Sequence, residues 1–304
     1  MATRTEEAPD TTARGTLIGF GAVILWALLA PLTLASGEMP PFQRTAFCMI
    51  LGGALGLAWL ALKGVSLKRV FTQTPRAWLI GVGGLFGYHA SYFFALGHAP
   101  PVAASLLNYL WPLLIVLMAG FATGEPLRPM VLAGALLGLA GAATAVLAES
   151  NFHLEIAPEH LAGYAGALAA AFIWSGYSVL SRRHGATSTA AVAAFCLVAG
   201  ILATLCHLLF EPRTIWPADS QAWGFFMLLA LGPMGAAFFL WDHGVKKGDL
   251  QTLGALSYLT PALSTAALTL GGFVAPRWSS AAACGLIVVG AVLASRAGRL
   301  ARKG

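Results

Sequence analysis

Two short segments bring polar, aromatic and proline residues together inside otherwise apolar stretches of the chain. They are NYLWP at residues 108–112 and SYLTP at residues 257–261. Their side chains offer hydrogen bonds and ring stacking without a fixed charge. Proline has no backbone N–H, so each proline is expected to leave the carbonyl oxygen of Asn108 or Ser257 without its helical partner. Free carbonyls, hydroxyls and rings suit the binding of a neutral or zwitterionic molecule.

Other aromatic and polar residues are expected at a similar depth in their helices. At about 1.5 Å per residue, Trp111 lies roughly 16 Å from the start of its helix, and Trp26 lies about as far from the start of its own. Aromatic belts occur at helix ends and do not account for these positions, whereas core filling remains an alternative for each one. The residues predicted to bind a substrate are Trp26, His89, Tyr92, Asn108, Tyr109, Trp111, Trp174, Tyr177, Ser257 and Tyr258, with Pro112 and Pro261 as helix breaks.

Ionisable residues inside apolar stretches are further candidates, because a charge buried in a membrane usually serves a function. His89 is the most central and is the candidate proton carrier, with a hydrogen-bonded core histidine as the alternative. Arg44 lies only about 8 Å into its helix, so it could reach the interface, pair with Glu38 or guide a carboxylate. We predict roles for Arg44 and Glu38 in admitting the substrate or in gating. Asp242 and His243 are expected at the membrane interface.

Acidic residues are missing from the middle of every apolar stretch. Carboxylate relays are the usual means of coupling transport to protons or sodium, so facilitated diffusion or exchange is favoured. The four cysteines also lie in apolar stretches, without the spacing of a metal site. We therefore expect no metal and no cofactor.

The composition assigns the chain to the membrane. Of its 304 residues, 58% are hydrophobic and only 10% are charged, whereas a soluble domain carries about 25% charged residues. The basic residues stand in short clusters between apolar stretches, not in one patch, which argues against a nucleic-acid partner. The expected partners are the lipid bilayer and a small-molecule substrate, and the chain is expected to be a monomer or a weak homo-oligomer.

Ten apolar stretches are long enough to cross a bilayer as helices, which takes about 20 residues each. They are residues 15–35, 40–62, 77–97, 101–123, 129–148, 161–181, 189–210, 221–243, 250–272 and 279–297. Of the 18 lysines and arginines, 15 fall in the termini and one set of alternate loops, and 3 fall in the other set. The positive-inside rule therefore predicts an inner (plasma) membrane protein whose two termini are cytoplasmic.

The chain repeats itself with an offset of 148–149 residues. Trp26 aligns with Trp174, Gly141 aligns with Gly290, and the two proline segments align with each other. Each repeat holds five spans, an odd number, so the second repeat must lie upside down relative to the first, as in many transporters. We predict an all-α membrane protein of ten helices in two inverted five-helix repeats. Its parts are a cytoplasmic tail at 1–14, the first repeat at 15–148, an external loop at 149–160, the second repeat at 161–297 and a basic cytoplasmic tail at 298–304.

Four motifs occur in an order and spacing typical of one family of membrane proteins. They are PPFQRTAF (40–47), GHAPPVAASLLNYLWPLL (97–114), EPLRPMVLAGALLGLAGAATAV (125–146) and KKGDLQTLGALSYLTPALSTAAL (246–268). In this order the chain resembles the EamA-type branch of the drug/metabolite transporter superfamily over nearly its whole length. It departs from the family pattern in FVAPRWSS (273–280), which lacks the acid expected before the last helix.

The resemblance implies a transporter that exports small metabolites by alternating access through a midplane cavity between the repeats, and not an enzyme. Aromatic and other neutral amino acids are favoured, because an uncharged aromatic cavity suits them and the chain resembles the aromatic amino-acid exporters. A phosphate-bearing substrate would need central Lys or Arg, and none is present. The alternatives are a multidrug or other metabolite exporter of the same superfamily, a membrane-embedded enzyme acting on lipid-linked substrates, and a structural scaffold.

Overall fold

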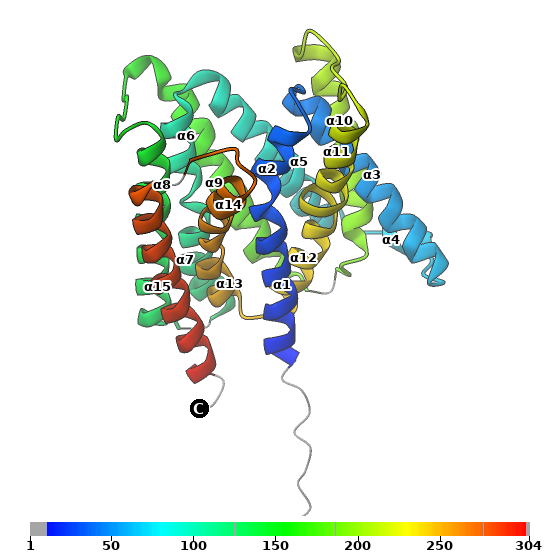
Figure 1. Ribbon diagram of the computed structural model, residues 1–304. Coiled ribbons are helices and arrows are strands. Elements are labelled where there is room, and N and C mark those ends of the chain that lie inside the picture. The colour runs from blue at the N-terminus through cyan, green and yellow to red at the C-terminus, as the bar shows by residue number, and fades with distance from the viewer. Residues whose placement is uncertain (1–10, 125, 186, 276, 302–304) are drawn as a thin grey trace, which may run out of the picture.

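The regular structure of the described part of the chain is helical. The computed structural model describes residues 11–124, 126–185, 187–275 and 277–301, and ten of its spans are long and apolar enough to cross a membrane (Figure 1). The unbroken α-helices are α3 (Pro41–Leu62), α5 (Pro75–His98), α8 (Pro129–Glu149), α9 (Leu161–Arg183), α10 (Ala191–Phe210) and α15 (Trp278–Ala301). A short helix, α4 (Leu67–Phe71), links two spans, and one 3-10 turn, η1 (Pro158–His160), precedes α9.

Four spans are broken near their middle. They consist of α1 (Thr11–Ala27) with α2 (Leu29–Ala35), α6 (Pro101–Asn108) with α7 (Trp111–Thr123), α11 (Ser220–Leu231) with the π-helix η2 (Gly232–Ala236) and α12 (Ala237–Lys247), and α13 (Leu250–Leu256) with α14 (Leu259–Leu270). The breaks before Pro112 and Pro261 were predicted. Those before Pro31 and at Pro233 were not, although the same missing N–H predicts a break there.

The carbonyl oxygen at one predicted break is not free. The carbonyl of Ser257 accepts a hydrogen bond of 3.1 Å from the backbone N–H of Thr260. The expectation of an unpartnered carbonyl at Ser257 is therefore wrong, because the chain tightens there into a turn with an i→i+3 bond.

Helices extend into both predicted tails. α1 begins at Thr11 and α15 continues to Ala301, so part of each predicted tail is helical. Residues 1–10 and 302–304, and the acidic residue that opens the 125–146 motif, lie outside the described residues.

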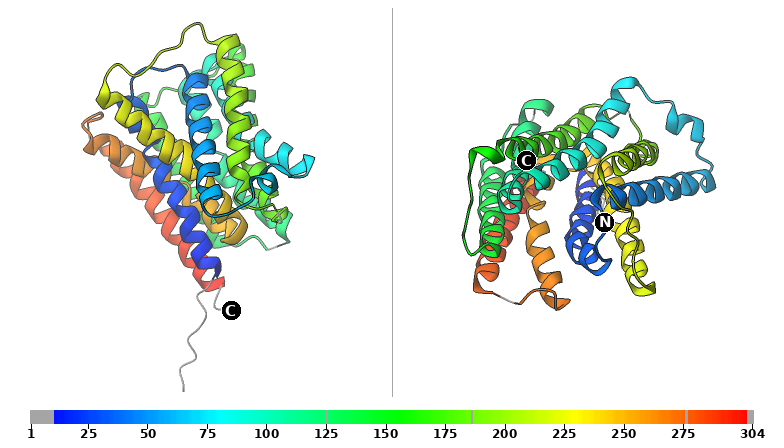
Figure 2. Two further views of the ribbon diagram at one scale, coloured as in Figure 1. Left: turned by 90° about the vertical axis from the view of Figure 1, so that its right-hand side faces the viewer. Right: turned by 90° about the horizontal axis from the view of Figure 1, so that it is seen from above.

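Two faces of the bundle are defined by the ends of the chain. α1 begins and α15 ends at one face, which we call the terminal face (Figure 1). The connection from α8 to η1 lies at the opposite face, which we call the loop face. Seen from above, α8 and α15 stand at one edge of the bundle and α3 and α10 at the other, with α5 packed on α9 and α1 packed on α12 between them (Figure 2).

Matching contacts in the two repeats follow the inverted symmetry. At the terminal face, a Cβ on Gly15 would lie 2.6 Å from the backbone of Lys247. At the loop face, a Cβ on Gly163, which lies 148 positions later, would lie 2.6 Å from the backbone of His98. Only glycine permits either approach, so the first helix of each repeat is seated in the same way on opposite faces.

Glycines also set the close packing of α8 on α15. A Cβ on Gly134 would lie 2.5 Å from the carbonyl oxygen of Gly290, and one on Gly141 would lie 2.6 Å from the side chain of Ile287. Small residues let membrane helices approach closely and gain dispersion contacts. This pair of helices forms a scaffold at the edge of the bundle.

Candidate functional site

A cavity of about 360 Å³ lies between the two repeats. Its walls come from the broken spans α1–α2, α6–α7, η2–α12 and α13–α14, with further residues from α5, α8 and α9. Seven of the ten residues that the sequence predicts for binding line it: Trp26, His89, Tyr92, Asn108, Tyr109, Trp111 and Trp174. None of the described residues that line it is Asp, Glu, Lys or Arg. The cavity is therefore aromatic and polar but carries no fixed charge.

Four tryptophans from four spans pack together. Trp26, Trp111 and Trp174 line the cavity, and the fully buried Trp241 packs behind them. Trp26 lies 6.3 Å from Trp111, 5.5 Å from Trp174 and 5.2 Å from Trp241 between ring centroids. The rings of Trp174 and Trp241 are stacked at 6.2 Å, and the Trp241 indole N–H donates to the hydroxyl of Ser178 at 3.0 Å. The packing fixes the ring planes, so the cluster offers a rigid aromatic surface to a flat ligand.

Two buried polar atoms in the cavity wall have no hydrogen-bond partner, namely Oδ1 of Asn108 and Oγ1 of Thr260. The amide nitrogen of Asn108 donates to the hydroxyl of Tyr88 at 3.2 Å. Whichever way the amide is turned, one of its two polar atoms stays unpaired. A buried polar atom without a partner costs about 1–3 kcal/mol, so a ligand that satisfies both atoms would recover this cost.

His89 is hydrogen-bonded to its own helix. Its Nδ1 lies 2.7 Å from the carbonyl oxygen of Leu85. A carbonyl only accepts, so Nδ1 carries a hydrogen, and Nε2 is left for the cavity that His89 lines. The histidine is therefore buried and hydrogen-bonded, as the core alternative expected, and it also lies in the cavity wall. Its role as a proton carrier stays a prediction.

Three predicted binding residues do not line the cavity. Tyr177, Ser257 and Tyr258 are almost fully buried. Tyr258 packs between α8 and α15, and the Ser257 hydroxyl donates to the Leu253 carbonyl at 2.8 Å. In this conformation all three belong to the packed core below the cavity. The prolines Pro112 and Pro261 also lie outside its wall and shape the helices that form it.

Arg44 and Glu38 lie away from the cavity, near the loop face. The Arg44 guanidinium donates through Nη2 to the carbonyl of Gly37 at 2.9 Å, and its Nε is buried without a partner. Among the described residues Arg44 and Glu38 form no ion pair with each other, so the pairing considered from the sequence is absent here. Their roles in admission or gating stay predictions.

Asp242 lies near the end of its span but is covered by protein, and its place at the depth of the membrane interface stays a prediction. Its carboxylate is 2% exposed, lies 2.7 Å from the Lys246 ammonium and accepts a 2.6 Å hydrogen bond from the Thr189 hydroxyl. Lys246 is one helical turn later and folds back on it, so the pair is buried between α9, α10 and α12. The position near a helix end suggested an interface, but the neighbouring helices cover it.

The cavity is closed towards the terminal face. There α13 packs against α7, and a Cβ on Gly254 would lie 3.0 Å from the Pro112 carbonyl. The repeat equivalents of these two helices are α6 and α14, which contribute opposite residues such as Ser105 and Ser264 to the cavity wall. Thus α7 and α13 are packed together, whereas their repeat equivalents, α14 and α6, are parted by the cavity.

Tyr88 lines the cavity beside His89 and was not among the predicted binding residues. Two further residues of the aromatic cluster were missed from the sequence, Trp241 and Phe238. Both sit after a π-helix in a span whose end was judged interfacial. Each is the 149-residue equivalent of a predicted site residue, since Phe238 corresponds to His89 and Trp241 to Tyr92. Phe238 contacts His89 at 6.2 Å between ring centroids. Applying the repeat offset to every candidate would have identified both.

Ten spans in inverted repeats around an uncharged cavity at the broken helices define a membrane transporter. The profile of the EamA-like transporter family matches the chain twice, at residues 13–147 and 161–296. The chain belongs to this family.

Individual relatives are similar over most of their length. The chain is 50% identical to the aromatic amino acid exporter YddG of Ancylobacter novellus over 280 residues, which cover 92% of this chain and 96% of the relative. It is 26% identical to the aromatic amino acid exporter YddG of Escherichia coli, covering 84% and 88% of the two chains. A solved structure described as "Crystal structure of protein" has a TM-score of 0.89 at 49% identity, covering 94% of this chain and 98% of the other.

Proposed function

We propose that this protein exports aromatic and other neutral amino acids by alternating access through the cavity between its repeats. The observation that carries the proposal is a rigid surface of three tryptophans, Trp26, Trp111 and Trp174, backed by the buried Trp241. It lies beside two unpaired polar atoms, in a cavity whose described lining has no charged side chains. The names of the relatives in Ancylobacter novellus and Escherichia coli support the same substrate class. They also support transport rather than catalysis.

The two ends of an aromatic amino acid fit different parts of the site. An aromatic side chain would stack or pack edge-on against Trp26, Trp111 and Trp174, in the geometry that these rings already adopt with one another. The ammonium group would donate to Oδ1 of Asn108, and the carboxylate would accept from the hydroxyl of Thr260. Both atoms are unpaired without ligand, so their hydrogen bonds favour a zwitterion over a purely apolar molecule.

The orientation of the chain in the membrane follows from its charge. The termini and the loops of the terminal face hold 15 of the 18 lysines and arginines, so the positive-inside rule makes the terminal face cytoplasmic. The cavity then opens to the outside in this conformation, as an exporter does when it releases substrate. The residues that line the cavity come from one chain, which supports transport by a monomer.

Counterflow tests the proposal. Purified protein in liposomes preloaded with tryptophan should take up radiolabelled tryptophan and phenylalanine faster than leucine. Trp111→Ala should lower the rate roughly tenfold, because it removes a stacking partner. Trp278→Ala is the matched control, because Trp278 is 92% exposed at the start of α15 and its loss should leave the rate unchanged.

The competing functions give different results in the same assay. Uptake of no amino acid at all, by protein whose thermal unfolding is normal, would overturn the proposal. Stabilisation against heat by apolar drugs or other metabolites, without any by amino acids, would point to a different exporter of the same family.

A further inference from the structure

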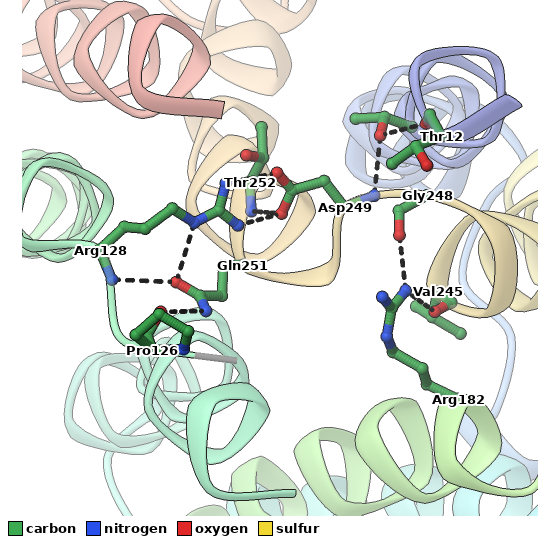
Figure 3. Close-up of polar contacts among 10 residues, drawn as sticks. Thr12, Pro126, Arg128, Arg182, Val245, Gly248, Asp249, Gln251 and Thr252 are labelled. Carbon is green, nitrogen blue, oxygen red and sulfur yellow. Dashed lines mark hydrogen bonds and ion pairs between the residues drawn. The ribbon is translucent and has the colours of Figure 1, made fainter. Parts of the chain in front are cut away.

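The terminal face is held shut by polar contacts between the repeats. Arg128, in the turn between α7 and α8, donates through both guanidinium ends to the carboxylate of Asp249, with distances of 2.6 and 2.5 Å (Figure 3). The backbone N–H and Nε of Arg128 both lie 3.3 Å from Oε1 of Gln251, and the Gln251 amide donates to the carbonyl of Pro126 at 3.1 Å. A bidentate arginine–carboxylate pair has a defined geometry and is stronger than a single neutral hydrogen bond.

The turn between α12 and α13, which contains Asp249, is also held by two other helices. The backbone N–H of Asp249 donates to the hydroxyl of Thr16 on α1 at 2.9 Å. Arg182, at the end of α9, donates to the carbonyls of Gly248 and Val245 at 2.6 and 3.3 Å (Figure 3). The turn between α12 and α13 is therefore tied to the first repeat and to α9 at once.

The inverted repeat shows what the loop face offers in place of these contacts. The equivalent of Arg128 is Arg277, and the equivalent of Asp249 is Pro100. Arg277 donates to the Ala148 carbonyl at 3.3 Å, and the turn that it would meet, HAPPV at 98–102, contains no carboxylate. Among the described residues, the ion pair between Arg128 and Asp249 thus has no counterpart at the equivalent position on the loop face.

The repeat offset also identifies residues that would surround an opening towards the terminal face. Leu29, Asn108 and Tyr109 line the present cavity, and their equivalents 148 or 149 positions later are Tyr177, Ser257 and Tyr258. Gln251 is the equivalent of Val102, which also lines the cavity. All of these equivalents are buried in this conformation, in the half of the protein that the Arg128–Asp249 pair closes.

We propose that Arg128 and Asp249 form a one-sided lock over a latent mouth of the cavity, whose walls include Tyr177, Gln251, Ser257 and Tyr258. When the pair separates, the repeats exchange conformations, so these residues come to face the terminal side as Leu29, Val102, Asn108 and Tyr109 now face the loop side. Because the lock has no counterpart, the protein without substrate rests open to the loop face. This inference rests on the alternating access of the proposed function.

Thiol labelling tests the lock independently of any substrate. In a background with Cys48, Cys196, Cys206 and Cys284 replaced by alanine, Ser257→Cys reports the latent mouth and Ser264→Cys reports the present one. The purified protein in nanodiscs exposes both faces to a small charged thiol reagent. Asp249→Asn removes the charge and keeps an oxygen for the Thr252 N–H that Asp249 caps at 3.0 Å. It should speed labelling of Ser257→Cys about tenfold, within the usual range of conformational coupling, and slow labelling of Ser264→Cys.

Three comparisons decide the outcome. Arg128→Gln should act in the same direction, and the double variant should add little, because both changes break one pair. Asp219→Asn is the matched control, since Asp219 caps α11 through the Ala222 N–H at the loop face and takes no part in the lock; it should change neither rate. Cys48 is fully buried. A variant whose only cysteine is Cys48 should therefore stay unlabelled even when it also carries Asp249→Asn.

An unchanged labelling rate of Ser257→Cys in Asp249→Asn would overturn the lock. Equal acceleration at Cys48 would also count against it, because that result means unfolding and not opening. Counterflow of tryptophan by the parent protein is measured separately. A failure of the lock would thus leave transport intact, and a failure of transport would leave the labelling result standing.

Discussion

The hydroxyl of Tyr258 donates a 3.0 Å hydrogen bond to the carbonyl oxygen of Tyr109, its counterpart 149 residues earlier in the other repeat. Both residues lie at the breaks of their spans, between α6 and α7 and between α13 and α14. The bond therefore joins the two broken helices where the backbone departs from regular helical hydrogen bonding. It also places the symmetry axis of the repeats next to the substrate cavity.

Removing this hydroxyl should weaken the fold. Tyr258→Phe leaves the ring in place and withdraws the donor from a buried carbonyl, which costs about 1–3 kcal/mol. The measurement is the thermal unfolding midpoint of the purified protein, followed by size-exclusion chromatography. Tyr164→Phe is the comparison, because the Tyr164 hydroxyl donates to the Glu155 carbonyl in an exposed position; it should lower the midpoint less. An equal fall in the unfolding midpoint of both variants would show that the buried Tyr258–Tyr109 bond stabilises the fold no more than the exposed one.

The unpaired hydroxyl of Thr260 should matter for substrate and not for stability. Thr260→Val keeps the shape and loses no hydrogen bond of the free protein. One hydrogen bond to the substrate is worth roughly 0.5–1.5 kcal/mol, so KM for tryptophan should rise roughly three- to tenfold with little change in thermal stability. Thr269→Val, on the same helix but outside the cavity wall, should leave KM unchanged. An unaltered KM in Thr260→Val would remove Thr260 from the site.

Two glycines of the α8–α15 pair of helices should respond oppositely to alanine. A Cβ on Gly134 would lie 2.5 Å from the carbonyl oxygen of Gly290, so backbones must move apart. Overpacking of this kind costs about 1–3 kcal/mol, and the unfolding midpoint of Gly134→Ala should fall. A Cβ on Gly285 in α15 would have no neighbouring atom within 4 Å, so Gly285→Ala should be neutral or slightly stabilising. A neutral Gly134→Ala would contradict the observed closeness of the two helices.

The Asp249 carboxylate should make stability depend on acid pH. Burial raises the pKa of Asp249, but hydrogen bonds from Arg128 and Thr252 and the arginine charge outweigh it, so the net pKa lies below the usual value. A lowered folded-state pKa contributes stability that is present above the ordinary carboxyl pKa and is lost as the pH falls through the folded-state value. The difference in unfolding midpoint between the parent and Asp249→Asn should therefore be constant from pH 7 to about pH 5 and shrink below about pH 4. A difference that grows in acid would reverse the assignment.

Much of the site followed from the sequence because its signals are local. A proline four residues after a carbonyl removes a helical bond in any environment, so the breaks at Asn108 and Ser257 were predicted from each segment alone. Seven predicted binding residues line one cavity. Polar side chains in the middle of an apolar span face the interior of the bundle because exposure to lipid is costly. Trp241 lies inside the predicted span 221–243 but close to its end, beside Asp242 and His243, which were expected at the interface, and it was therefore not considered for the site.

Side-chain pairing was less accessible to sequence reasoning. No partner was predicted for Asp242, yet it is paired with Lys246 and Thr189 and covered by neighbouring helices. The ion pair between Arg128 and Asp249 joins residues 121 positions apart, and nothing in either segment marks the other as its partner. The Asp242–Lys246 pair lies within α12, but its burial depends on the neighbouring helices that cover it. The Arg128–Asp249 pair depends on how helices from different repeats pack, which hydropathy does not encode.

The sequence by itself determined the membrane environment, the ten spans, the two inverted repeats and the aromatic, uncharged character of the site. Each of these is a property of single helices or of two segments compared with each other, and so it can be read without knowing how the helices pack. Only the tertiary structure decided that α6 and α14 are parted while α7 and α13 are packed together. It thereby decided that Asn108 and Tyr109 face a cavity while Ser257 and Tyr258 are buried. The two repeats are similar in these segments, so which of them is closed here rests on contacts between the repeats.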